Sequence, residues 1–228
     1  MPSVLFVFTS ADKTLSGKQT GWYLPEAAHP YYVLSPHASI DFASPNGPNP
    51  PIDEGSVELF AKDAGSVQFL GDETVKGKFA SAKKLSEVDV KAYDAVFYVG
   101  GHGPVLDLAS DPVNAKLVSE FWIAGKIVSA VCHGPAALVG GVDASGQSIF
   151  AGRNATGFSN QEEITIDKVK EIPFLLEDRI IELAGKYTKA DAPWAPKVVV
   201  DGQLITGQNP ASAEPIGHAI LKALQAGI

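Results

Sequence analysis

The sequence predicts an α/β fold with a mostly parallel central sheet. Apolar, strand-like runs alternate with helix-like segments, which is the order typical of βαβ units. Three runs, beginning at Val4, Ala95 and Ile127, are almost wholly apolar, as expected of strands covered on both faces by helices. The 228 residues, of which 45% are hydrophobic, can bury a sizeable core. We therefore expect residues 1–228 to form a single domain.

The expected strands are short and separated by helical or loop segments. They are residues 4–9, 39–42, 95–99, 127–131, 197–200 and 204–206. Asp201-Gly202 separates the last two strands and is typical of a hairpin turn. Residues 45–51 and 190–196 are rich in proline or glycine, so we expect them to be loops.

Two helices have recognisable boundaries. Asp111 is a suitable N-cap, and Pro112 suits the first helical position. This pair predicts a helix that runs to Ala124 and ends at Gly125. Residues 212–226 are expected to form the closing helix.

Composition excludes several classes of function. A net charge of -8 and a pI near 5.1 argue against nucleic acid and against an anionic membrane surface as partners. No stretch approaches the roughly 18 apolar residues of a membrane span. The chain enters its first strand without a basic leader segment, so we expect no signal peptide. A single cysteine cannot form an intrachain disulfide, which suits a reducing cytoplasm.

Cys132 has the most informative setting in the chain. It follows the apolar run 127–131 and directly precedes His133-Gly134-Pro135. This pattern predicts a strand, a tight turn and a helix, with a thiol at the corner, which is the arrangement of a nucleophile elbow. A helix N-terminus behind the sulfur would favour the thiolate. The alternative is a buried cysteine that acts only as a small hydrophobic residue.

Glycines follow the neighbouring apolar strand. Gly100-Gly101-His102-Gly103 falls at the strand's C-terminal end, where open α/β sheets bind ligands. The N–H groups of Gly101 and His133 are candidates for an oxyanion hole. His102 is expected to line the wall of the same site. The alternative is an ordinary tight turn.

Carboxylates supply the candidate acids and bases. Glu26 lies among apolar and small residues; a buried carboxyl there would have a raised pKa and could share a proton with the thiol. The alternative is a solvated helix carboxylate. Glu162 and Glu163 both compete to orient His133, and the sequence alone does not choose between them. His133 itself reaches the sulfur only if the turn folds its ring back.

Several separated stretches resemble one family. Residues 130–136 and 98–103 resemble the ThiJ/PfpI family of the class I glutamine-amidotransferase-like superfamily. Three further stretches are similar to its fungal heat-shock chaperone-like glyoxalase III branch: residues 25–30, 156–158 and 206–212. True amidotransferases carry a late His-Pro-Glu run, whereas here Glu214-Pro215 follows an alanine.

The resemblance implies a flavodoxin-like three-layer α/β sandwich and a glutathione-independent glyoxalase III, or D-lactate dehydratase. Such enzymes convert methylglyoxal, a small α-oxoaldehyde, to D-lactate without a cofactor or metal, and they often form homodimers. The family's nucleophile maps to Cys132, its adjacent histidine to His133 and its early acid to Glu26. Its late acid maps to Glu163, with Glu162 one residue away.

Three alternative functions stay open. A stress-response holdase chaperone would bind unfolded clients through apolar surface. A redox sensor would oxidise Cys132 to the sulfinic acid, since no second cysteine is present to resolve it. A cysteine-dependent hydrolase or deglycase would use the same nucleophile with a different pocket.

Overall fold

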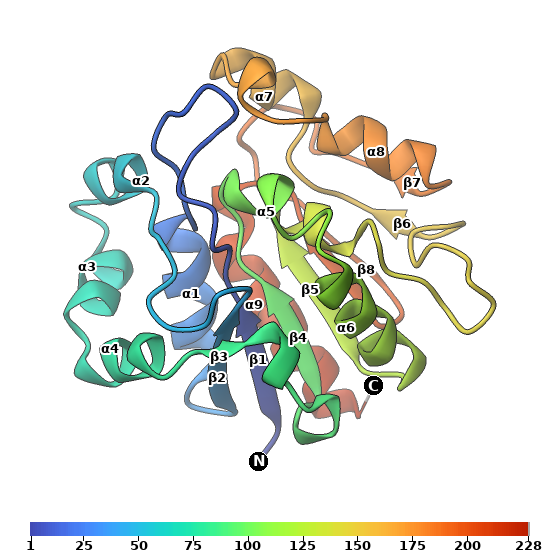
Figure 1. Ribbon diagram of the computed structural model, residues 1–228, viewed down its shortest axis with the longest axis horizontal. Helices are drawn as coiled ribbons and strands as arrows, with labels where there is room; N and C mark the ends of the chain where they lie inside the picture. The colour runs from blue at the N-terminus through green and yellow to red at the C-terminus, as the bar shows by residue number, and fades with distance from the viewer. Residues whose placement is uncertain (228) are drawn as a thin grey trace.

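A parallel sheet forms the centre of the molecule in a computed structural model that describes residues 1–227 (Figure 1). Within these residues, seven strands follow the order β3-β2-β1-β4-β5-β9-β8. Their bounds are β1 Ser3–Val7, β2 Ser39–Ser44, β3 Lys83–Lys84, β4 Ala95–Tyr98, β5 Ile127–Val131, β8 Val198–Asp201 and β9 Leu204–Gly207. β8 alone in this sheet runs antiparallel to its neighbour, β9. The expected α/β class is confirmed.

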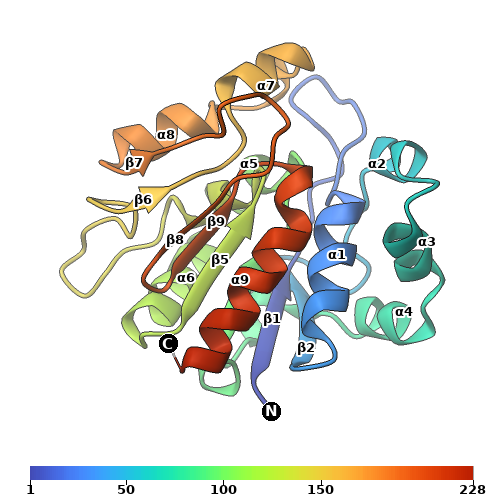
Figure 2. The ribbon, with the colours of Figure 1, turned by 180° about the vertical axis from the view of Figure 1, so that it is seen from behind.

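Helices cover both faces of this sheet. α6 (Pro112–Ile123) and the short α5 (Gly103–Leu106) lie over one face (Figure 1). α1 (Leu24–Leu34) and α9 (Ala213–Ala226) lie side by side over the other face (Figure 2). This three-layer arrangement leaves β4 and β5 completely buried, which explains why both are apolar on both faces.

The remaining elements lie beside the sheet or over the ends of its strands. Near β2 and β3 the chain forms α2 (Glu54–Leu59), α3 (Ala64–Gly71) and α4 (Glu73–Ala80). Over the C-terminal ends of the strands lies a cap (Figure 1), made of β6 (Asn154–Ala155), α7 (Asn160–Thr165), α8 (Leu176–Glu182) and β7 (Lys186–Tyr187). The 3₁₀ helices are η1 Leu85–Glu87, η2 Val90–Ala92, η3 Gly134–Leu138, η4 Val169–Glu171 and η5 Pro210–Ser212.

The capping and turn residues expected from the sequence take up those roles in the structure. The Asp111 side chain accepts the Val113 N–H at 2.8 Å at the start of α6, and Gly125 follows its C-cap with φ 72°. Asp201-Gly202 turns β8 into β9 with φ 59° at the glycine. The first strand is shorter than expected, because Thr9 leaves the ladder and its hydroxyl donates to Asp107 at 2.8 Å.

Candidate active site

Cys132 stands at a sharp turn directly after β5. Its φ of 60° is left-handed, a region that costs a non-glycine residue energy. The Cys132 N–H donates to the Gly207 carbonyl at 2.9 Å, and its carbonyl accepts from the Phe158 N–H at 2.9 Å. β9 on one side and the cap segment on the other therefore hold the turn in place. Such strain persists only where its surroundings fix it, and it is concentrated at functional sites.

A helix follows this turn, as expected from the sequence. It is a 3₁₀ helix of five residues, η3. So short a helix has a small dipole, and it contributes little to ionising the thiol.

Glu26 and Cys132 meet beside Gly100. Glu26 lies in the first turn of α1 and is fully buried. A Cβ atom on Gly100 would lie 2.1 Å from Glu26 Oε2 and 2.8 Å from Cys132 Cβ. Only glycine leaves space there for the carboxyl and the sulfur. Among residues 1–227, neither Glu26 oxygen has a hydrogen-bond partner of good geometry, so both oxygens are free to act on the neighbouring sulfur or on a substrate.

Burial governs the protonation of this pair. It raises the pKa of Glu26 well above the usual range. Burial, together with the Glu26 charge, also raises the pKa of the Cys132 thiol, and only the Gly101 N–H opposes this. Two negative charges side by side in this dry site are unfavourable, so the pair retains at least one proton. The expectation of a thiolate favoured by the helix N-terminus is therefore wrong; ionisation of the sulfur requires a protonated Glu26.

The Gly101 N–H acts on the Cys132 sulfur, and the His133 N–H belongs to the residue that follows it. Gly101 has φ 101°, and a Cβ there would lie 2.3 Å from the Gly21 carbonyl oxygen. Within the described chain, the N–H groups of Gly101 and His133 donate to no carbonyl oxygen. Neither N–H group is thus committed to a carbonyl, and the oxyanion hole expected from the sequence stays a prediction.

Glu163 holds two histidines at once. His133 Nδ1 lies 3.5 Å from Cys132 Sγ, because the left-handed turn folds the ring back. The other ring nitrogen, Nε2, lies 2.5 Å from Glu163 Oε2, and His102 Nε2 lies 2.7 Å from Glu163 Oε1. Burial opposes the charge of Glu163, but the two histidines outweigh it and hold its pKa below the usual range. Burial and the neighbouring His133 lower the pKa of His102.

Glu162 faces away from His133. Its carboxylate accepts the Ser159 N–H and O–H at 3.0 and 2.7 Å, which makes Ser159-x-x-Glu162 a capping box at the start of α7. Burial opposes its charge, but hydrogen bonds from Asn209, Ser159 and Gln208 prevail and lower its pKa. The capping-box motif is visible in the sequence and would have assigned Glu162 to the helix start, leaving Glu163 for His133.

A cavity of about 340 Å³ opens onto the sulfur. Its polar lining is Gly101, His102, Cys132 and His133, and the rest is Tyr23, Leu59, Phe158, Ile166, Trp194 and Pro210. Sequence reasoning missed this second group as functional, since its members come from segments far apart in the chain. The available signals were Phe158 and Pro210, each within a stretch that resembles the family, and Trp194, between two prolines.

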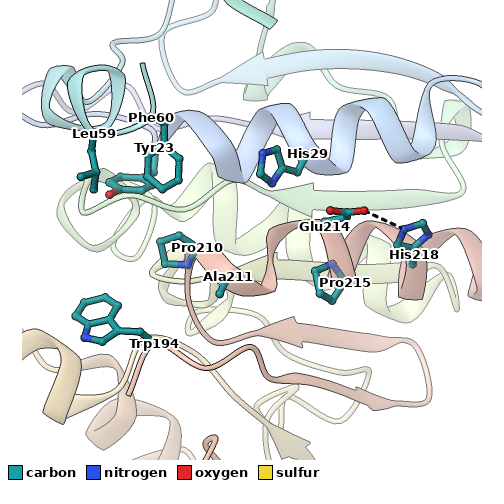
Figure 3. Close-up of a pocket in the computed structure, with 10 residues that line it drawn as sticks. All are labelled: Tyr23, His29, Leu59, Phe60, Trp194, Pro210, Ala211, Glu214, Pro215 and His218. Carbon is teal, nitrogen blue, oxygen red and sulfur yellow. Dashed lines mark ion pairs between the residues drawn. The ribbon is translucent and has the colours of Figure 1, made fainter. Parts of the chain in front are cut away.

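A larger groove of about 840 Å³ lies outside this cavity and shares four lining residues with it: Tyr23, Leu59, Trp194 and Pro210 (Figure 3). Farther along the groove, His218 contacts Glu214 at 3.7 Å on the exposed face of α9, as residues four apart on a helix can. His29 is paired with Asp63 at 2.8 Å.

The described residues contain one group able to hold a metal ion. Ligand atoms of His102, His133 and Glu163 lie within 4.8 Å of one another, and two histidines with a carboxylate are a ligand set that transition metals accept. In this structure the three side chains are hydrogen-bonded to one another.

Comparison with known proteins was made on both sequence and structure. The profile of the DJ-1/PfpI family matches residues 26–223. Glyoxalase 3 of Candida albicans is 31% identical, over 99% of this chain and 99% of its own. The glutathione-independent glyoxalase HSP31 of Saccharomyces cerevisiae is 29% identical, over 97% and 98% respectively. The crystal structure of the 24 kDa Rapid Encystment Protein of Francisella tularensis is 36% identical and superposes with a TM-score of 0.92, covering 98% of this chain and 99% of that one.

Proposed function

Because the chain belongs to the DJ-1/PfpI family, we propose that it is a glutathione-independent glyoxalase III that converts methylglyoxal to D-lactate. The observation that carries this proposal is the buried Glu26–Cys132 pair, with His133 and Glu163 beside it, at the end of a small apolar cavity. Relatives named as glyoxalases match almost their whole length. The reaction adds water and rearranges hydrogen within the substrate, so it needs neither an oxidant nor a thiol cofactor.

The first step is addition of sulfur to the aldehyde carbon. In the reactive form of the pair, Glu26 carries the shared proton and Cys132 is the thiolate. Sulfur forms a bond to the carbon, and the carbonyl π electrons move to oxygen. The N–H groups of Gly101 and His133 stabilise that oxyanion. Glu26 then donates its proton to this oxygen, which gives a neutral hemithioacetal and a Glu26 carboxylate.

The second step moves hydrogen between the two carbons. The Glu26 carboxylate, now a base in an apolar site, removes the proton from the former aldehyde carbon, which gives an enediolate and a protonated Glu26. The hydroxyl proton on the first oxygen passes to the neighbouring oxyanion, Glu26 returns its proton to the adjacent carbon, and a lactoyl thioester and a Glu26 carboxylate result. A single carboxyl that serves one face of the enediol fixes the configuration of the product.

The third step is hydrolysis of the thioester. His133 is oriented by Glu163 and is suited to take a proton from the attacking water. Cleavage of the carbon–sulfur bond releases lactate and restores the one proton that Cys132 and Glu26 share. The His102 ring lies against His133, with centroids 4.2 Å apart, and its bond to Glu163 helps to fix that carboxylate.

The test is turnover of methylglyoxal without added thiol, with the lactate assigned by a D-specific dehydrogenase. We expect Cys132→Ala to abolish D-lactate formation while its circular dichroism and melting temperature stay close to those of the unaltered protein. D-Lactate formation that continues in this variant would reject the mechanism. Aggregation suppression that survives in it, without turnover in the unaltered protein, would favour the holdase alternative.

The cellular setting also belongs to this proposal. We place the enzyme in the cytoplasm, acting on a small aldehyde, and the homodimer implied by the resemblance stays a prediction. Among residues 1–227, no helix has the length and apolar character that a membrane crossing requires.

A further inference from the structure

We propose that the preferred substrate of this cavity carries a flat, apolar substituent of about phenyl size on its ketone carbon, and that Trp194 selects it. This inference rests on the proposed glyoxalase function and narrows its substrate class to aryl α-oxoaldehydes.

The cavity is larger than methylglyoxal requires. Its volume of about 340 Å³ falls in the range of roughly 300–1,000 Å³ found for pockets that take drug-sized ligands, whereas methylglyoxal has only five non-hydrogen atoms. The reacting dicarbonyl must lie at the polar end, beside Cys132 and the N–H groups of Gly101 and His133. The remaining space is lined by side chains without formal charge, three of them aromatic: Tyr23, Leu59, Phe158, Ile166, Trp194 and Pro210.

The aromatic side chains lie on different sides of this space. Phe158 packs against His133, with ring centroids 4.4 Å apart, and so lies next to the chemistry. Trp194 meets Phe158 edge-on at 5.7 Å. Tyr23 lies across the opening from Trp194 (Figure 3), and among the described residues no ring contact joins these two. Tyr23 and Trp194 thus line the same cavity from separate segments, and their rings can both contact a flat apolar group bound there.

Trp194 occupies an unfavourable backbone conformation. Its φ is 66°, in the left-handed region where glycine would be the least strained residue. Strain of this kind persists where the surroundings fix it, and it is typical of ligand-binding positions. The backbone at Trp194 must therefore be held in place by its neighbours.

Hydrogen bonds to Glu162 hold the Trp194 backbone in this conformation. The Trp194 N–H donates to Glu162 Oε1 at 3.0 Å. Asn209 Nδ2 donates both to the same Oε1 and to the Ala195 carbonyl, each at 2.8 Å. The buried carboxylate thus connects the Trp194 loop to α7, whose other acid, Glu163, holds the two histidines. Glu162 is therefore a positioning residue for the side of the cavity that Trp194 forms, called here the Trp194 wall.

The experiment compares phenylglyoxal with methylglyoxal. The readout is the ratio of kcat/KM for phenylglyoxal to that for methylglyoxal, and comparison of variant with unaltered protein cancels the different intrinsic reactivities of the two aldehydes. We expect the unaltered protein to prefer phenylglyoxal. Trp194→Ala should lower the ratio by about 10-fold or more, the range for loss of an apolar pocket contact. Trp194→Phe should restore most of it.

Two further variants test whether the change in the kcat/KM ratio comes from the position of Trp194. Glu162→Gln places an N–H₂ group among hydrogen-bond donors, so it should lower the same ratio, mainly through a raised KM for phenylglyoxal. Ile123→Ala, at an exposed position on α6, is the matched control and should leave the ratio unchanged.

The outcomes separate this inference from the function on which it rests. An unaltered protein that turns over neither aldehyde rejects the glyoxalase proposal. Turnover of methylglyoxal with a preference against phenylglyoxal overturns the substrate assignment alone. A ratio that stays the same in Trp194→Ala overturns the role of Trp194.

Discussion

Glu26 and Cys132 form a pair that shares protons, and this has consequences for both rate and stability. Glu26 is the group best placed to move hydrogen between the substrate carbons. Glu26→Gln keeps the shape of the side chain but removes its acid–base function. We expect kcat/KM for methylglyoxal to fall by about 10²–10⁴-fold, the range for loss of a general acid–base group. Wild-type rates in this variant would show that His133 carries the proton transfer.

The same variant tests the raised pKa of Glu26 through stability. The folded state holds this proton to higher pH than the unfolded state, whose glutamate has a pKa of about 4.3. The proton's contribution to stability is therefore complete below a pH of about 4.3 and is lost as pH rises towards the raised folded pKa. A tenfold difference in proton affinity between the two states corresponds to about 1.4 kcal/mol, or about 3–6 °C for a chain of this size.

Melting temperatures at pH 5 and pH 8 provide the measurement. The unaltered protein should lose more stability between these values than Glu26→Gln, which cannot ionise at this position. Both values lie below the range where a thiol with a raised pKa titrates, so Cys132 does not obscure the comparison. Parallel pH dependence in the two proteins would contradict a raised Glu26 pKa.

At the scale of elements, the turn after β4 determines whether α1 and β5 can bring their acid and thiol together. Gly100→Ala would place a Cβ 2.1 Å from Glu26 Oε2 and 2.5 Å from the Val131 carbonyl oxygen. Such overpacking costs about 1–3 kcal/mol. Because the carboxyl must move, we expect kcat/KM for methylglyoxal to fall at least about 100-fold, as displacement of catalytic groups by about 1 Å does.

Gly125→Ala is the matched control for this glycine. Gly125 ends α6 with φ 72°, and a Cβ there meets nothing within 4 Å. We expect a loss of about 1–2 kcal/mol from the left-handed backbone, measured by denaturant unfolding, with kcat/KM unchanged. Equal losses of activity in the two variants would mean that Gly100 acts through stability alone.

Features of the fold that depend on neighbouring residues could be predicted from the sequence. Asp111, Gly125 and the Asp201-Gly202 turn were predictable because each depends on interactions within a few residues. The corner at Cys132 was predictable for the same reason. The helix expected after it is present as η3, but its 3₁₀ type and its length of five residues were not predicted.

Long-range parts of the site could not be predicted without the fold. Glu163 binds His102, 61 residues away, and no local pattern records that contact. The Trp194 wall depends on Glu162 and Asn209, which arrive from two other segments. The protonation of Cys132 was misjudged because burial, which only the packed structure defines, outweighs the local dipole.

At the scale of the whole molecule, we predict that the chain unfolds as a single domain. The cap over the strand ends is hydrogen-bonded to the sheet at Cys132 and, through Thr156, to Thr206 in β9. Thermal unfolding followed by tryptophan fluorescence and by far-UV circular dichroism should therefore give coincident transitions. The three tryptophans, Trp22, Trp122 and Trp194, report from separate regions. An earlier fluorescence transition would show that the cap opens independently.

The pairing of β5 with β9 has a consequence for the protein during its synthesis. The Cys132 corner is fixed by the Gly207 carbonyl, so a ribosome that has made Cys132 has not yet made the residue that shapes it. A nascent chain carries an ordinary cysteine, and a product truncated before Gly207 would be inert towards the aldehyde. The Cys132 site is thus completed late in translation, once β9 has joined the sheet.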